Sequence, residues 1–318
     1  MPYLLLYNSK YGLLYERGIK VKAICVDIGG TSIKYGLLEQ KNARQKVEVL
    51  FRASADWNPK EIDGTGVSQF VYDLIKDTLE SETIDFIGVS TAGVVDVDSG
   101  HIVSANDNIP NYTGYPLKDE LERLIKKPVA VENDVNSATL AEFYQGHTQG
   151  TQSNVCLTIG TGVGGGAILA GELFRGHNHS AMEVGYIPIE NTTLEDGGST
   201  TGLVRRCEAR LNSNEPLNGK KIFDLIKHEQ NKVCIEEVDV MVKTIAKGLE
   251  IISYVIDPEK IVLGGGIMQQ SDYLILRIQK ELDQLINKHI PVEAAKHLNN
   301  AGMVGAFYHA KNQIIGDD

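Results

Sequence analysis

The sequence predicts an α/β protein of two domains, and three observations support this prediction. Apolar runs of strand length alternate with segments of helical periodicity along the chain. Each half contains a strand, a glycine-rich turn and a second strand, which predicts an antiparallel hairpin in each half. A chain of 318 residues also suits one large or two linked domains.

The elements expected in the first half follow in order from these patterns. A strand over 21–28 leads to a turn at Gly29-Gly30 and to a second strand near 32–38. Helical spacing occupies 67–79. The remaining expected elements are a buried strand over 84–90, a helix over 117–125, a strand over 129–132 and a helix from Asp134 through Tyr144.

The second half begins with the same pattern. A strand over 155–159 precedes the glycine run 160–166 and a strand over 167–173. At an offset of 131 residues (155 − 24), Ile28 aligns with Ile159, which indicates an internal duplication. The later expected elements are a strand over 260–263, a turn at 264–266, a helix with an apolar face over 274–286 and a helix near 301–314.

These elements predict the domain limits. We expect an N-terminal extension over 1–20 and a first domain over 21–134. The C-terminal helix is expected to pack back on this domain and to add about 301–318 to it. The second domain is then 135–300.

Composition and charge narrow the functional classes. The hydrophobic fraction of 42% is ordinary for a globular protein, and the net charge of −11 disfavours a nucleic-acid surface. The first 20 residues lack the features of a signal peptide, and no segment reaches the ~20 apolar residues of a membrane span, so we expect a cytoplasmic protein without a membrane partner. The four scattered cysteines predict neither a disulfide framework nor a metal site.

The first glycine turn is a candidate phosphate site. Backbone N–H groups around Gly29 and Gly30 can approach phosphate oxygens because no Cβ intervenes. Asp27 ends a buried strand, where an unpaired carboxylate is costly, and positioning Mg²⁺, directly or through water, would explain it. An ordinary hairpin with a turn-capping aspartate is the alternative. Three further side chains could contact phosphate here: Thr31, Ser32 and Lys34.

The second glycine turn matches the dinucleotide-binding pattern G-x-G-x-x-G, beginning with Gly160, Thr161 and Gly162. That motif requires a helix after the turn, whereas 167–173 predicts a strand. A second phosphate-binding hairpin therefore fits better than a nicotinamide-dependent oxidoreductase.

A third turn contains Gly265 and Gly266, between a buried strand and a helix. It either lets adenosine approach the backbone or forms only a tight turn.

The pair Asn133-Asp134 lies at a strand-to-helix junction, where both residue types are ordinary N-caps. In the functional interpretation, Asp134 accepts the proton of a hydroxyl that attacks a γ-phosphate, and the helix N-terminus favours its ionised form. Asn133 can donate and accept, which suits a sugar hydroxyl. Glu183 and Glu195 are further candidates, and Glu183 is either a sugar ligand or a solvated strand residue.

Six segments, in this order, resemble the ROK family of sugar kinases and related repressors. They are 26–34, 88–96, 131–138, 157–168, 183–186 and 263–267, and the resemblance extends from Val21 to about His309. It implies an actin-like, hexokinase-like (ribonuclease H-like) fold that binds ATP and sugar in a cleft between two domains. Homodimerisation is a further expectation from the family.

The resemblance also implies roles for single residues. Asp134 resembles the catalytic base and Asp27 the metal-positioning aspartate. Positions that resemble sugar contacts, or lie beside them, are Gly30, Asn108, Asn133, Glu183 and Glu195. Positions expected to contact ATP or its phosphates are Gly29, Thr31, Ser32, Lys34, Gly160, Thr161, Gly162, Gly265 and Gly266.

The sequence departs from the family pattern at the zinc site. Most members have a cysteine cluster and a histidine in an E-x-G-H segment, but Tyr186 replaces that histidine here and the cluster is missing. We therefore expect ATP and Mg²⁺ but no zinc. The family histidine also touches the sugar, so Tyr186 becomes a candidate substrate contact.

The expected activity is transfer of the γ-phosphate of ATP to the 6-hydroxyl of a hexose or N-acetylhexosamine. N-acetylmannosamine is the first choice, because zinc-free members with E-x-G-Y include N-acetylmannosamine kinases and β-glucoside kinases. A glucokinase or β-glucoside kinase is the alternative. A sugar-responsive transcriptional regulator is disfavoured, because about 20 residues before the first strand are too few for a helix-turn-helix.

Overall fold

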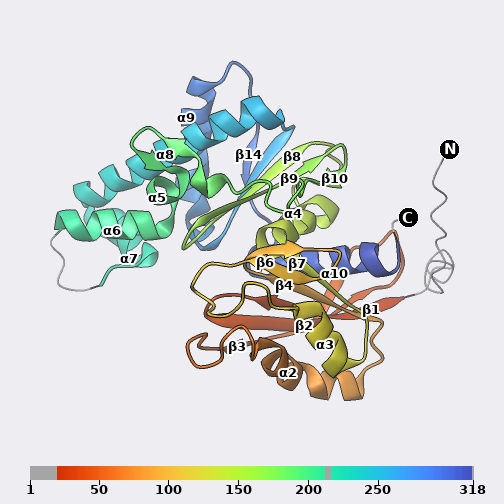
Figure 1. The fold of residues 1–318 in the computed structure, drawn as a ribbon. Helices are drawn as coiled ribbons and strands as arrows, with labels where there is room; N and C mark the ends of the chain where they lie inside the picture. Colours follow the sequence, from red (N-terminus) through yellow and green to blue (C-terminus); the bar gives the residue numbers. More distant parts are fainter. Residues whose placement is uncertain (1–19, 212–215, 317–318) are drawn as a thin grey trace. The chain divides into compact units, whose positions relative to one another are not determined.

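The computed structural model describes residues 20–211 and 216–316, so the expected N-terminal extension lies almost wholly outside the described residues. The described chain forms two compact units, both with helices and strands, which confirms the α/β class (Figure 1). Unit 1 contains residues 20–144 and 299–316, and unit 2 contains residues 145–298. The limit falls after Tyr144 rather than after Asp134, because α4 (Asp134–Gln145) packs on the C-terminal helix, where Tyr144 stacks on Tyr308.

Unit 1 is built on a five-stranded sheet in the order β3-β2-β1-β4-β7. The first three strands along the chain pair antiparallel, whereas β1, β4 and β7 run parallel. Their carboxyl ends therefore meet at one edge of the sheet. The strands are β1 (Val21–Ile28), β2 (Ser32–Gln40), β3 (Glu48–Asp56), β4 (Phe86–Thr91) and β7 (Val129–Asn133).

Helices cover both faces of this sheet. Alternate residues of β1, such as Val26, join a buried apolar cluster with α2 (Val67–Ser81) and α3 (Leu117–Ile125). The other face packs against α10 (Ala301–Ile314) so closely that a Cβ on Gly88 would lie 2.5 Å from the carbonyl oxygen of Ala306. A small hairpin, β5 (Val94–Asp96) and β6 (His101–Ser104), follows β4.

Unit 2 repeats this arrangement in the order β10-β9-β8-β13-β14. Again the hairpin strands pair antiparallel and the last three strands in the order run parallel. The predicted internal duplication is confirmed at the level of strand order and direction. The strands are β8 (Asn154–Ile159), β9 (Val163–Leu169), β10 (Glu172–Leu173), β13 (Lys260–Gly264) and β14 (Val292–Ala294).

The helices of unit 2 surround the long α8, whose buried side chains recur every three or four residues as in an amphipathic helix. These helices and the sheet share one apolar core. The helices are α5 (Leu194–Gly198), α6 (Thr200–Leu211), α7 (Gly219–Glu229), α8 (Lys232–Ile256) and α9 (Ser271–Leu285). Short elements complete the unit: η1 (Val184–Tyr186), β11 (Pro188–Ile189), β12 (Thr192–Thr193) and η2 (Gly266–Gln270).

The sequence predicted neither a membrane span nor a disulfide framework. Among residues 20–211 and 216–316, no helix is both long and apolar enough to cross a membrane. The four cysteines are free thiols and buried.

Candidate functional site

The β1–β2 turn is held by hydrogen bonds at Gly29 and is open at Gly30. The N–H of Gly29 donates to the carbonyl of Ser32 at 3.1 Å, and the indole Nε1 of buried Trp57 donates to the carbonyl of Gly29 at 2.8 Å. A Cβ on Gly30 would meet nothing within 4 Å. Two hydrogen bonds therefore hold the turn and the space beside Gly30 stays open, as a phosphate-binding turn requires. Trp57 was not predicted, because no local motif marks it.

Asp27 lies beside this turn and is paired across two neighbouring strands. The strand register places it opposite Lys34 on β2 and Ser90 on β4. Lys34 Nζ lies 3.2 Å from Oδ2, and Ser90 Oγ donates to Oδ1 at 2.8 Å. Since both contacts are to other strands, the turn-capping alternative for Asp27 does not describe its environment. Ser90 is a site residue that the sequence analysis missed.

The N-terminal turn of α10 also lies against Asp27. A Cβ on Gly302 would overlap Oδ1 and lie 2.5 Å from Cγ of Asp27. Glycine at 302 thus permits a close approach that no other residue type allows.

Asn133 and Asp134 begin α4 and are fixed by backbone contacts. Asn133 Oδ1 accepts from the N–H groups of Val135 and Asn136 at 2.9 and 3.0 Å, so Asn133 caps the helix. Its Nδ2 donates to the carbonyl of Gly93 at 2.9 Å and to Asp134 Oδ1 at 3.1 Å. The cap and the carboxylate are therefore one hydrogen-bonded unit.

A buried contact between a carboxylate and an imidazole lies next to this unit. Glu132, 1% exposed, accepts with Oε1 from the N–H of Asn133 at 2.9 Å and from Nδ2 of Asn136 at 3.0 Å. Its Oε2 lies 3.6 Å from Nδ1 of His309 on α10. His309 was not predicted from sequence, because its contact with Glu132 joins distant segments of the chain.

The parallel strands bring these groups to the same sheet edge. Ser90 is in register with Asp27 on one side and with Glu132 on the other. Asp134 directly follows β7, and Asp27 lies on β1, two strands away in the sheet. At ~4.8 Å between neighbouring strands, β1 and β7 are about 10 Å apart.

Asn108, by contrast, lies exposed in the loop between β6 and α3, and its N–H donates to Oδ1 of Asn106 at 3.2 Å.

In unit 2, Glu195 lies against the second glycine turn. Its Oε2 accepts from the N–H of Val163 at 3.0 Å. A Cβ on Gly162 would overlap Oε2, and one on Gly185 would lie 3.3 Å from it. The structure thus joins a predicted sugar ligand to a predicted phosphate turn, and the glycine at 162 makes room for the carboxylate.

Glu183 immediately precedes η1 and lies close enough to Glu195 to interact with its charge. Partial burial raises the pKa of the Glu183 carboxyl, and the negative charge of Glu195 raises it further. Although Glu183 keeps exposed surface, surrounding protein atoms replace part of its water. Tyr186, at the end of η1, is 78% exposed. Two carboxylates and an exposed aromatic ring therefore lie within one short segment of chain.

The glycine turns of unit 2 have structural reasons of their own. The chain continues from Gly162 into β9, which pairs antiparallel with β8, so the helix required by a dinucleotide-binding motif is replaced by a strand. Gly160 accepts with its carbonyl from the N–H of Thr200, at the start of α6, at 2.9 Å. Gly265 has φ = 90° and a Cβ there would overlap the carbonyl oxygen of Ile159, whereas Gly266 faces open space.

The residues present fit Mg²⁺ bound together with a nucleotide. Mg²⁺ keeps several waters and commonly binds through one or two carboxylates plus phosphate oxygens. Asp27, whose side chain is 15% exposed, is such a single carboxylate. Within the described part of the chain, no three His, Cys, Asp or Glu side chains are grouped as a metal site. The absence of zinc stays a prediction.

Comparison with known sequences shows the family. The ROK family model matches residues 23–313. A β-glucoside kinase of Listeria monocytogenes is 33% identical over 301 residues, which cover 91% of this chain and 97% of the relative. An uncharacterised protein of Clostridium perfringens is 37% identical over 295 residues, with 91% and 97% covered.

Solved structures of ROK family proteins are also similar to this chain. A Listeria monocytogenes protein proposed to be an N-acetylmannosamine kinase is 30% identical, with a TM-score of 0.81 and coverage of 92% and 99% of the two chains. A glucokinase of Streptomyces griseus, in complex with glucose and AMPPNP, is 27% identical, with a TM-score of 0.78 and coverage of 90% and 97%. A ROK transcriptional regulator at 21% identity shares the fold alone.

The chain therefore has the two-domain, hexokinase-like fold of sugar kinases. It belongs to the ROK family, and its named relatives place it among the ATP-dependent carbohydrate kinases. The regulator alternative is not favoured, and the oxidoreductase alternative lacks its structural context.

Proposed function

We propose that this kinase transfers the γ-phosphate of ATP to the 6-hydroxyl of a hexose or N-acetylhexosamine, with Asp134 as the general base. The fixed position of Asp134 at the start of α4 is the observation that supports this most directly. Phosphoryl transfer depends mainly on positioning and charge neutralisation, with one carboxylate to orient the attacking hydroxyl.

In the proposed step, the sugar oxygen attacks the γ-phosphorus while its proton passes to the Asp134 carboxylate. The new O–P bond forms as the bond from the γ-phosphorus to the β,γ-bridging oxygen breaks, and ADP leaves with that electron pair. Asn133 holds one oxygen of the carboxylate at 3.1 Å and so limits its rotation. Positioning of this kind accounts for a large share of rate enhancement in enzymes.

The glycine turns and Asp27 are proposed to hold the nucleotide. Backbone N–H groups near Gly30 and Gly162 would contact phosphate oxygens, and Lys34 would add positive charge. Mg²⁺, when bound, would neutralise phosphate charge, and Asp27 would hold it directly or through water.

The sugar is proposed to contact Asn133, Glu183 and Glu195, and N-acetylmannosamine remains the first choice. The Listeria relative that is 30% identical supports it, since that protein is proposed to be an N-acetylmannosamine kinase. A β-glucoside is the second candidate, because β-glucoside kinases are 33% and 31% identical. The exposed ring of Tyr186 would offer a β-glucoside an apolar face for its aglycone.

A coupled ADP-release assay tests the proposal with N-acetylmannosamine, N-acetylglucosamine, glucose, mannose and cellobiose. Turnover of N-acetylmannosamine with the highest kcat/KM supports the first choice, and a preference for cellobiose selects the second. No turnover with any of these sugars would overturn the sugar-kinase proposal. Homodimerisation and a cytoplasmic location stay predictions.

A further inference from the structure

The segment that carries Glu195 is a very short helix that depends on its surroundings. Helix α5 has five residues, and isolated helices below ~12 residues are marginal in water. Thr193 Oγ1 accepts from the N–H of Asp196 at 3.1 Å, and the N–H of Ser199 donates to the carbonyl of Glu195 at 2.9 Å. Packing against neighbouring elements, α6 and α8 among them, must supply the rest of its stability.

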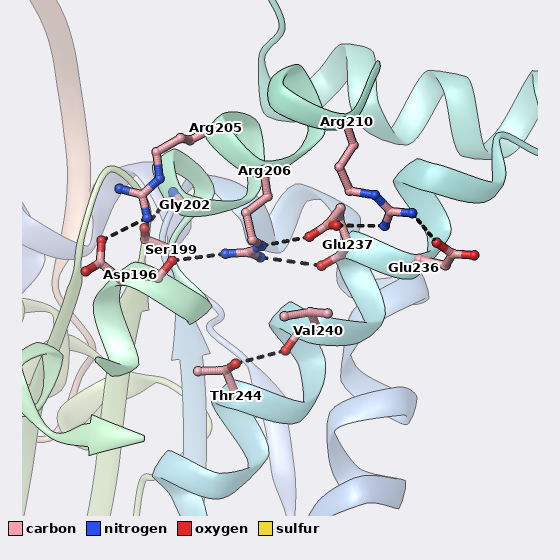
Figure 2. Close-up of polar contacts among 10 residues, drawn as sticks. All are labelled: Asp196, Ser199, Gly202, Arg205, Arg206, Arg210, Glu236, Glu237, Val240 and Thr244. Carbon is pink, nitrogen blue, oxygen red and sulfur yellow. Dashed lines mark hydrogen bonds and ion pairs between the residues drawn. The ribbon is translucent and has the colours of Figure 1, made fainter. Parts of the chain in front are cut away.

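Arg206 on α6 makes such a contact with the residue that follows Glu195. Its Nη1 donates to the main-chain carbonyl of Asp196 at 3.0 Å (Figure 2). Its Nε donates to Oε2 of Glu237 on α8 at 2.8 Å. The rigid guanidinium fork therefore links the main chain of α5 to α8, which a flexible ammonium group cannot reproduce.

Close packing keeps this carbonyl in place. A Cβ on Gly202 would overlap the carbonyl oxygen of Asp196, and a Cβ on Gly197 would lie 2.6 Å from Cγ2 of Thr244 on α8. Helix α5 is therefore confined between α6 and α8. A small change in the position of Asp196 moves the neighbouring Glu195.

Two nearby arginines, Arg205 and Arg210, can be compared with Arg206 (Figure 2). Arg205, with a side chain 64% exposed, reaches the same Asp196 but binds its carboxylate Oδ1 at 3.1 Å. Arg210 shares the buried Glu237 through Oε1 at 2.8 Å and also binds Glu236. Among these three arginines, the described contacts join only Arg206 to both the α5 main chain and α8.

We propose that Arg206 is a positioning residue that orients Glu195 for sugar binding by fixing the α5 main chain. This inference rests on the proposed role of Glu195 as a sugar ligand. Loss of Arg206 leaves Glu237 paired with Arg210, so the buried carboxylate is not left without a counter-charge and the fold is expected to survive.

Steady-state kinetics with N-acetylmannosamine, or with cellobiose if that is the preferred sugar, test this role. Arg206→Ala is expected to raise the sugar KM about tenfold and to change the KM for ATP less than about twofold. Arg205→Ala and Arg210→Ala are the matched controls, and both should keep the sugar KM within about twofold of the wild type. An unchanged sugar KM in Arg206→Ala, or an equal rise in Arg210→Ala, would overturn the inference.

A double-mutant cycle separates this inference from the proposed function. If Arg206 acts through Glu195, adding Arg206→Ala to Glu195→Gln should raise the sugar KM less than about twofold further. If Glu195→Gln alone leaves the sugar KM unchanged, the proposed sugar-ligand role fails. If Glu195→Gln raises the KM and the two effects multiply fully, the positioning role of Arg206 fails instead.

Hydrogen exchange provides a readout that does not depend on any sugar. Arg206→Ala should speed amide exchange in α5 by about tenfold, whereas Arg205→Ala should leave it unchanged. Equal exchange rates in the wild type and Arg206→Ala would contradict the proposal.

Discussion

Gly302 at the start of α10 touches the carboxylate of Asp27, so closely that any side chain at 302 would displace it. The two residues come from opposite ends of the chain. The contact gives the C-terminal helix a direct part in positioning the group proposed to hold Mg²⁺. It also explains why the first turn of α10 contains a glycine, a residue that lowers helix propensity by ~1 kcal/mol.

Gly302→Ala is therefore expected to lower kcat by about tenfold or more and to raise the Mg²⁺ concentration needed for half-maximal rate. The added methyl group would push Asp27 away from Ser90 and Lys34. Mg²⁺ titrations of ADP release measure the effect. Gly305→Ala is the comparison, because a Cβ there overlaps the carbonyl oxygen of Ser137 on α4 and not Asp27. An equal shift in Mg²⁺ dependence in both variants would show that general loss of packing, not Asp27, is responsible.

Asp134→Asn is expected to lower kcat by about 10²–10⁴-fold, because the variant cannot accept a proton from the attacking hydroxyl. The sugar KM should change little, since Asn is nearly isosteric and can still accept from the N–H of Val135. Asp107→Asn, in an exposed loop, is the control. A variant at position 134 with near wild-type turnover would reject Asp134 as the base.

Part of this site was predictable from sequence and part was not. The hairpins around Gly29 and Gly160 could be predicted because a strand, a glycine turn and a strand are local signals. The partners of Asp27, namely Ser90 and Gly302, could not, since only sheet register and the return of α10 bring them together. Similarly, no helices were predicted between 174 and 259, where α6 and α8 make the arginine contacts proposed to position Glu195.

Glu183 should make stability depend on pH. Its pKa is raised above the ordinary 4.5 by burial and by the negative charge of Glu195. The folded state therefore holds this proton at pH values where the unfolded chain has released it. The contribution of Glu183 to the free energy of unfolding is largest below about pH 4.5, falls as pH rises through its folded-state pKa, and is constant above it.

Denaturant unfolding of the wild type and Glu183→Gln between about pH 4 and pH 8 measures this dependence. The wild type should become less stable relative to Glu183→Gln as the pH rises. Glu195→Gln should weaken the dependence, because it removes one of the two causes of the shift. A stability difference that grows in the opposite direction would contradict the assigned environment of Glu183.

Glu132 offers the sharpest test of how the protein supports its catalytic carboxylate. Glu132→Gln keeps an oxygen that can accept from the N–H of Asn133 and from Asn136, and replaces the charged oxygen facing His309 with an uncharged NH2 group. Glu132→Ala removes this acceptor and leaves its two donors, the N–H of Asn133 and Nδ2 of Asn136, without it, which costs about 1–3 kcal/mol of stability for each unpaired group. We expect Glu132→Gln to keep kcat within about fivefold of the wild type. Glu132→Ala should lower kcat by about tenfold or more, because Asn133 then loses its hydrogen bond to Glu132 and Asp134 turns with it.

Circular dichroism confirms folding of each variant, and ADP release at saturating sugar measures kcat. If a folded Glu132→Ala protein turns over as fast as Glu132→Gln, the hydrogen bonds below Asn133 have no part in positioning Asp134.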